Sequence, residues 1–190
     1  RSRSVRAAPP GVPPGTVRIG YPTTRRPSVS TLIEGIVAGV AARYGDRVRF
    51  EFVGWMPEGL ERSPNVALAS HIDGYPRYAA YVASRRWDLG LAPIAGTRFD
   101  GFKTDLKYRE YGAIGTPAVY GAGPPYDDVV VHGANGVVAS HDADAWVAAI
   151  ASLIDDPARR ARIAAAARDD VVRTRGLAAT GALHAEALVR

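Results

Sequence analysis

The feature that most constrains the fold is a regular alternation of short apolar segments with longer segments of helical periodicity. The apolar segments, rich in β-branched and aromatic residues, cover residues 17–19, 48–54, 65–69, 87–93, 118–120 and 136–139. The segments with helical spacing cover residues 28–44, 75–85, 105–114, 143–153 and 158–172. Strands separated by helices of this length pair in parallel through right-handed crossovers. The pattern therefore predicts an α/β domain with a Rossmann-like, doubly wound parallel sheet.

Residues at the segment ends support these boundaries. Ser28 or Thr31 can cap the first helix, and Thr31 with Glu34 has the spacing of a capping box. Gly115 follows the third helix, where a glycine commonly ends a helix. Asp142 stands directly before the fourth helix and is expected to cap it.

The ends of the chain differ from its centre. Residues 1–15 contain four prolines and no apolar periodicity, which predicts a Pro-rich linker or disordered leader. Residues 16–175 carry the alternating pattern, and residues 176–190 are expected to form a helical tail. At 190 residues the chain has room for a single domain of ordinary size.

Composition excludes several classes of protein. Without cysteine, the chain cannot be a disulfide-stapled module, hold a cysteine-ligated zinc ion or use a cysteine nucleophile. It contains no signal-peptide pattern and no transmembrane segment, and we expect a cytoplasmic protein. The net charge is +5, but the arginines are dispersed and not gathered beside stacking aromatics, so we expect no nucleic-acid partner.

Ligands of such sheets bind at the carboxyl ends of the strands, near helix N-termini. This rule singles out three loops, at residues 20–27, 92–105 and 121–133. None carries the glycine pattern of a dinucleotide-binding turn or of a P-loop, so a conventional nicotinamide enzyme or ATPase is not expected.

Both lysines of the chain, Lys103 and Lys107, lie at the middle loop, shortly before Glu110. If the following helix starts early, the three side chains share one face. Two ammonium groups near a helix N-terminus would suit a diphosphate, and a carboxylate one turn further on could hold vicinal hydroxyls. The alternative is an exposed Lys107–Glu110 pair, which would contribute about 0.2–0.5 kcal/mol.

The string FDGFKTDLKYREYGAIGTPAVY, residues 99–120, resembles a motif of one family. The related pattern is F-N-x-x-K-S-D-L-K-x-x-E-Y-x-x-x-G-x-P-V-V, from the C-terminal donor-binding domain of retaining, group 1 glycosyltransferases with the GT-B fold. RRWDLGLAP precedes the string, and VVVHGANGVVASHDADAW and LIDDPARRARIAAAAR follow it, in the order of the family. The resemblance covers about residues 16–175.

The resemblance implies a binding site for a nucleoside diphosphate sugar. Glu110 matches the second acid of the family's paired-glutamate motif, which hydrogen-bonds the ribose hydroxyls. Backbone N–H groups around Thr104 and Asp105 would approach the diphosphate or the sugar, with Lys103 supplying charge. We expect no cofactor and no metal, because basic side chains and dipoles stabilise the leaving diphosphate in this family.

The chain also departs from the family pattern. Phe102 stands where the first acid of the pair is expected, so no catalytic group is assigned. The basic phosphate ligands after the first strand would come from Thr23, Thr24, Arg25 and Arg26, which do not follow the usual spacing.

The remaining candidate residues are assigned to the donor cleft, to a loop, to a helix start or to the core. We expect Tyr126 to line the donor cleft and His132 to be a solvated loop side chain. His141, Asp142 and Asp144 are interpreted as the start of a helix and not as a metal site. Four further side chains are expected in the core: Trp87, Tyr111, Ile114 and Trp146.

The resemblance implies transfer of a sugar from a nucleoside diphosphate to an acceptor hydroxyl on a glycan, lipid or protein. A GT-B enzyme binds its acceptor through an N-terminal domain. Because the chain begins at Arg1 and has room for one domain, we expect it to be inactive without that other half. The alternatives are a non-catalytic GT-B-like interaction domain of a larger protein and a nucleotide-sugar epimerase of the same fold.

Overall fold

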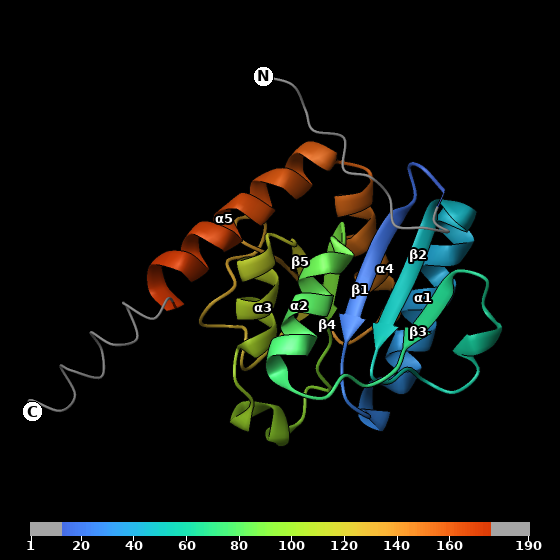
Figure 1. Ribbon diagram of the computed structural model, residues 1–190, viewed down its shortest axis with the longest axis horizontal. Helices are drawn as coiled ribbons and strands as arrows, with labels where there is room; N and C mark the ends of the chain where they lie inside the picture. The colour runs from blue at the N-terminus through green and yellow to red at the C-terminus, as the bar shows by residue number, and fades with distance from the viewer. Residues whose placement is uncertain (1–12, 176–190) are drawn as a thin grey trace, which may run out of the picture.

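The computed structural model describes residues 13–175. Six parallel strands form the centre of the molecule (Figure 1). Their order is β3-β2-β1-β4-β5-β6, so the direction of winding reverses between β1 and β4. The strands are β1 (Val17–Pro22), β2 (Val48–Val53), β3 (Val66–Ala69), β4 (Leu89–Ala92), β5 (Ala118–Gly121) and β6 (Val137–Ala139). The predicted doubly wound parallel sheet is confirmed.

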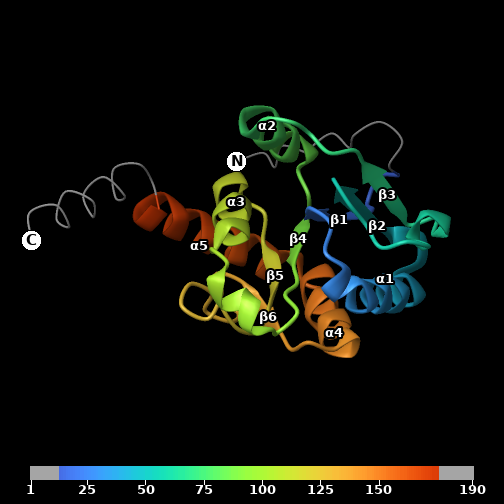
Figure 2. The same cartoon turned by 90° about the horizontal axis from the view of Figure 1, so that it is seen from below.

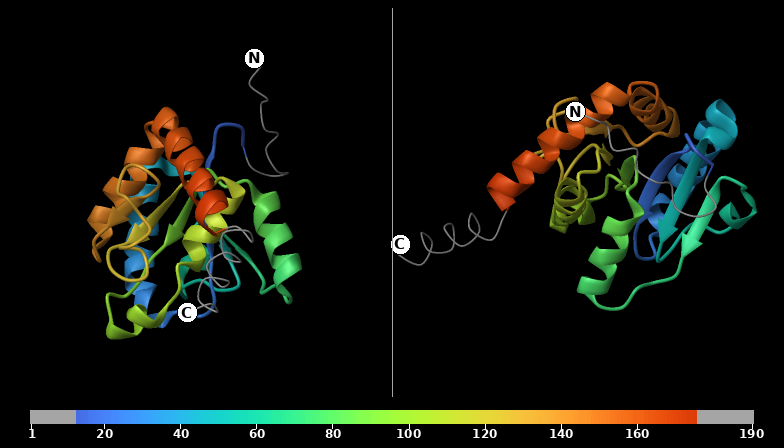
Figure 3. Two further views of the ribbon diagram at one scale, coloured as in Figure 1. Left: turned by 90° about the vertical axis from the view of Figure 1, so that its left-hand side faces the viewer. Right: turned by 45° about the horizontal axis from the view of Figure 1, so that its top comes forward.

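Helices cover both faces of the sheet (Figure 2). They are α1 (Ser30–Tyr44), α2 (Tyr75–Arg85), α3 (Leu106–Ile114), α4 (Ala143–Ile154) and α5 (Pro157–Arg175). One face carries α1 and α4, and the other carries α2 and α3. The long helix α5 crosses from the α4 side of the sheet to the α3 side (Figure 3). Ile163 packs in the core under α1 and α4, while Ala167 and Val171 pack against the α3 side.

The sequence forms this sandwich because the strands are apolar on both faces. Alternate side chains of β1 and β2, such as Ile19 and Phe50, join the core under α1 and α4. On the opposite face, Trp87, Tyr108 and Tyr111 fill the space beneath α2 and α3. The core positions predicted for Trp87, Tyr111 and Trp146 are confirmed, as each is at most 1% exposed, and Ile114 packs partly buried against the same core.

Helix ends test the cap predictions. The Asp142 carboxylate accepts a hydrogen bond from Ala145 N at 2.9 Å, and Gly115 ends α3 with a φ of 68°, both as predicted. The predicted cap of the first helix is wrong. Pro27 begins a 3₁₀ turn over Pro27–Val29, so the chain is already helical at Ser28, and Thr31 lies inside α1.

The predicted ends of the domain stay predictions. Of the leader expected at residues 1–15, only the last three lie within the described residues, and the tail expected at residues 176–190 lies outside them. Among the helices of residues 13–175, none has the length and apolar character needed to cross a bilayer.

Candidate nucleotide-sugar site

Two adjoining pockets lie at the carboxyl edge of the sheet, where β1 and β4 diverge. The first, of about 340 Å³, is lined by Thr23, Thr24, Val53, Gly54, His71, Ile72, Gly74, Tyr75, Tyr78, Leu106, Lys107 and Glu110. The second, of about 170 Å³, is lined by Tyr21, Thr23, Arg26, Ala92, Pro93, Ile94, Lys103, Thr104, Leu106, Lys107 and Tyr126. We name them the aromatic pocket and the basic pocket. Because they share Thr23, Leu106 and Lys107, one elongated ligand could occupy both.

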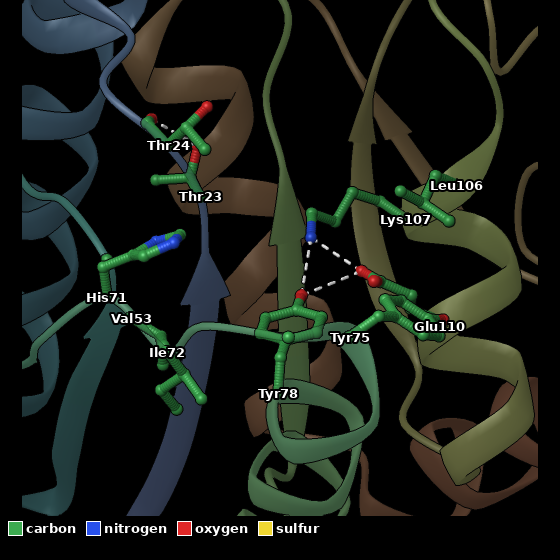
Figure 4. Close-up of a pocket in the computed structure, with 12 residues that line it drawn as sticks. Thr23, Thr24, Val53, His71, Ile72, Tyr75, Tyr78, Leu106, Lys107 and Glu110 are labelled. Atoms are coloured by element: carbon green, nitrogen blue, oxygen red, sulfur yellow. Dashed lines mark hydrogen bonds and ion pairs between the residues drawn. The ribbon is translucent and has the colours of Figure 1, made fainter.

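A closed triangle of polar groups forms one wall of the aromatic pocket (Figure 4). Lys107 Nζ lies 2.7 Å from Glu110 Oε2 and 3.0 Å from the Tyr78 hydroxyl, which is itself 3.1 Å from Glu110 Oε2. Burial lowers the pKa of Lys107, and the Glu110 carboxylate opposes that shift. Glu110 is only 9% exposed, so the exposed ion pair considered as an alternative is not what the structure contains.

The basic pocket brings together side chains from three segments. Lys103 and Thr104 come from the loop before α3, Arg26 from the loop after β1, and Tyr126 from the loop after β5. Lys103 is ion-paired with Asp100. Since α3 begins only at Leu106, Lys103 lies outside that helix, and the predicted common face of three side chains is reduced to Lys107 and Glu110.

Asp100 is 1% exposed and closes a capping box with Thr97. Burial alone would raise the pKa of Asp100, but hydrogen bonds from Lys103 and Thr97 outweigh burial and lower it. This acid supports the loop before α3 and is not one of the lining residues of the basic pocket.

The N-terminus of α3 is left without a side-chain cap. Asp105 precedes the helix, but its carboxylate instead contacts Arg109 Nε at 2.6 Å and Arg175 Nη1 at 3.2 Å. Within residues 13–175, the N–H groups of Leu106 and Lys107 have no hydrogen-bond acceptor. Free N–H groups at the positive end of a helix dipole attract anions. The backbone here can bind a phosphate, whereas the Asp105 side chain is outside both pockets.

Of the remaining residues considered in the sequence analysis, some line a pocket and others do not. Thr24 lines the aromatic pocket, whereas Arg25 is exposed and lines neither pocket, and Arg26 faces the basic pocket in its place. Phe102, at the position of the family's first acid, is 77% exposed. His132 is an exposed loop side chain, as predicted, whose Nδ1 accepts a hydrogen bond from Val138 N.

Of the lining residues with polar or aromatic side chains, four were not predicted from the sequence: Tyr21, His71, Tyr75 and Tyr78. Tyr75 and Tyr78 were placed correctly on a helix, and their spacing of three puts both on one face. Their approach to Glu110 depends on how α2 lies beside α3, which no local pattern encodes.

The sequence model of the glycosyl transferase-like family matches residues 26–178, which is most of the chain. The chain belongs to the glycosyl transferase-like family. No curated protein matches it.

Solved structures of glycosyltransferases share the fold of this family member. HepE of Anabaena, determined in complex with UDP and glucose, superposes with a TM-score of 0.72 at 16% identity over 92% of this chain and 48% of HepE. The C-terminal domain of LpcC from Francisella tularensis, a group 1 glycosyl transferase, gives 0.67 at 15% identity over 86% of this chain and 88% of that domain. Sucrose-phosphate synthase of Thermosynechococcus elongatus gives 0.68 at 22% identity over 93% and 47%.

The chain thus spans about half the length of HepE and of sucrose-phosphate synthase. Its fold is that of the C-terminal half of a GT-B glycosyltransferase, as the sequence predicted. Among the described residues, no three His, Asp or Glu side chains gather as a metal-binding group.

Proposed function

We propose that the two pockets together hold a nucleoside diphosphate sugar, and that the chain is the donor-binding domain of a retaining glycosyltransferase. The observation that carries the proposal is the partly buried Lys107–Glu110 pair, whose lysine lines both pockets, beside the uncapped N-terminus of α3. A carboxylate suits the ribose hydroxyls, and free N–H groups beside cations suit the diphosphate. HepE, which shares the fold, binds UDP.

Each side of the site then has a role. Glu110 accepts hydrogen bonds from the ribose hydroxyls in the aromatic pocket. In the basic pocket, the free backbone N–H groups of Leu106 and Lys107, which follow Thr104 and Asp105, bind the diphosphate. The side chains of Lys103, Lys107 and Arg26 add positive charge there.

Further side chains complete the proposed donor site. Thr24 contacts the donor in the aromatic pocket and Tyr126 in the basic pocket, and the exposed Arg25, next to Thr24 in the chain, adds positive charge. These cations and the dipole of α3 stabilise the negative charge that develops on the leaving diphosphate.

The chemistry needs a second partner. The donor sugar is passed, with retention, to the hydroxyl of a glycan, lipid or protein acceptor that binds mainly to another domain. This chain spans about half the length of HepE. That coverage supports the proposal that the chain binds the donor and does not transfer the sugar without another domain. A cytoplasmic location and the lack of a nucleic-acid partner stay predictions from the sequence.

Calorimetric titration with UDP-, GDP- and ADP-sugars tests the proposal. We expect one nucleotide class to bind, and Glu110→Gln to weaken its binding at least about tenfold, because a hydrogen bond to a charged group contributes about 1.5–3 kcal/mol. Glu34→Gln, which changes an exposed glutamate on α1, is the matched control. Equal affinity of wild type and Glu110→Gln would remove the assignment of Glu110.

A second candidate is a non-catalytic interaction domain. Phe99 and Phe102 are 69% and 77% exposed on the 3₁₀ segment Arg98–Phe102, where a protein partner could cover them. Failure of the folded domain to bind any nucleotide sugar in the panel would favour this function over donor binding.

A further inference from the structure

The polar triangle at Glu110 has one possible arrangement of its hydrogen bonds. An ammonium group only donates hydrogen bonds, so the Tyr78 oxygen accepts from Lys107 Nζ. The single proton of the phenol therefore points to Glu110 Oε2, 3.1 Å away. Tyr78 and Lys107 both donate a hydrogen bond to Glu110 Oε2, whereas Oε1 receives no hydrogen bond from residues 13–175. The triangle fixes one carboxylate oxygen and leaves the other available.

Tyr78 also belongs to a helix that is unevenly anchored. The C-terminal half of α2 contains its one buried residue, Val82, and ends at Arg85, whose carbonyl accepts from the buried Arg18 guanidinium. In the half that faces the pocket, residues 75–80, no side chain is buried. The hydrogen bonds of Tyr78 to Lys107 and Glu110 are the side-chain hydrogen bonds that join this half of α2 to α3 among the described residues.

We propose that Tyr78 is a positioning residue that sets the preference for ribonucleotides over 2′-deoxyribonucleotides. By donating to Oε2 and holding the N-terminal half of α2 against α3, it presents the Glu110 carboxylate in one orientation to the two hydroxyls of a ribose. Without the phenol oxygen, Lys107 alone holds Oε2, so the carboxylate can rotate about that one contact and the diol loses a prearranged acceptor. This inference rests on the proposed donor function and concerns a residue outside its assigned ligand contacts.

The test compares wild type with Tyr78→Phe in titrations with UDP, GDP and ADP and with the 2′-deoxy form of each. We expect wild type to prefer the ribonucleotide of the class that binds by about tenfold or more, the value of one hydrogen bond to a charged group. In Tyr78→Phe, affinity for that ribonucleotide falls and the preference drops below about threefold, while binding of the deoxynucleotide changes little.

Tyr81→Phe is the matched control, because it removes a phenol one turn further along α2 that has no hydrogen-bond partner in residues 13–175. A second readout needs no ligand: amide hydrogen exchange should speed up over residues 75–80 in Tyr78→Phe and stay unchanged over residues 81–85.

The outcomes separate the two proposals. Binding by wild type with the same ribose preference in Tyr78→Phe overturns the role of Tyr78 and leaves the donor site standing. If wild type binds no nucleoside diphosphate, both proposals fall. A uniform loss of affinity for ribo- and deoxynucleotides, together with faster exchange along all of α2, would show a merely structural role and also overturn the inference.

Discussion

At the scale of single residues, loss of the hydroxyl should destabilise the fold at one buried tyrosine, Tyr111, but not at another, Tyr21. The Tyr111 hydroxyl lies 2.7 Å from the Leu91 carbonyl and 3.2 Å from the Gly20 carbonyl, and so ties α3 to β1 and β4. The Tyr21 hydroxyl is buried without a hydrogen-bond partner among the described residues. We expect Tyr111→Phe to lower the free energy of unfolding by about 1 kcal/mol, and Tyr21→Phe to leave it unchanged or raise it.

Urea denaturation at one pH would measure both variants. Because each substitution removes one oxygen atom from a side chain at most 3% exposed, packing changes little and the comparison isolates hydrogen bonding. Equal destabilisation by the two variants would contradict this account.

Asp100 should make the domain sensitive to acid. Its pKa is lower in the folded protein than in the unfolded chain, since hydrogen bonds from Lys103 and Thr97 outweigh the effect of burial. The stability it contributes is therefore complete above about pH 4 and is lost as the pH falls through the folded pKa. Asp100→Asn should therefore flatten the fall in unfolding free energy below about pH 4, measured by urea titration at a series of pH values.

Asp169→Asn, which changes an exposed acid on α5, serves as the comparison and should keep the acid sensitivity of wild type. An identical pH profile for Asp100→Asn and wild type would show that the ion pair with Lys103 does not contribute to stability.

How much of the site was predictable follows from the distance along the chain between its members. Lys107 and Glu110 are three residues apart, so helical periodicity alone brings them together. Tyr78 lies 29 residues from Lys107, and its contact depends on the crossover that places α2 beside α3. Arg26 facing the basic pocket in place of Arg25 depends on the 3₁₀ turn at Pro27, which periodicity does not reveal.

At the scale of elements, the cap of α4 offers a clean measurement. The Asp142 carboxylate accepts from Ala145 N, which satisfies one of the free N–H groups of the first turn. Asp142→Ala should lower the free energy of unfolding by about 1 kcal/mol, the typical value for loss of an N-cap. Asp144→Ala removes an exposed acid from the same turn and should cost less, because it loses only the helix-dipole interaction of about 0.3–1 kcal/mol.

Thermal or urea unfolding of both variants would rank them, and a larger loss for Asp144→Ala would contradict the cap assignment. The helix itself was predictable, since its apolar spacing and its cap are both local. The 3₁₀ segment Arg98–Phe102 was not, because Asp100 closes it through contacts with Thr97 and Lys103 and not through an apolar repeat.

At the scale of the whole molecule, one buried ionic network joins the sheet to the helix that carries Tyr78. Both oxygens of Glu51 on β2 accept from Arg18 on β1, at 2.8 Å each. Glu51 Oε2 also accepts from Arg85 at the end of α2 and from Trp87 Nε1. The Arg18 and Glu51 side chains are each 5% exposed, so neither charge is compensated by water.

Removing one member of the Arg18–Glu51 pair should therefore lower the free energy of unfolding more than replacing both. Glu51→Ala leaves the Arg18 guanidinium buried and unpaired, and we expect it to lower the free energy of unfolding by about 3–5 kcal/mol. Combining Arg18→Met with Glu51→Leu replaces the pair by apolar side chains and should recover much of that loss, because burying two charges is itself unfavourable.

Urea denaturation of Arg18→Met, of Glu51→Leu and of the double variant, each compared with wild type, closes a thermodynamic cycle for the pair. The network also holds the C-terminal end of α2, while Tyr78 holds the end at the pocket. Glu51→Ala should then speed hydrogen exchange over residues 81–85 before residues 75–80, the reverse of Tyr78→Phe. If the two ends of α2 lose protection from hydrogen exchange independently, then the Glu51 network and Tyr78 each hold one end of the helix. If both ends lose protection together, then α2 opens as one unit.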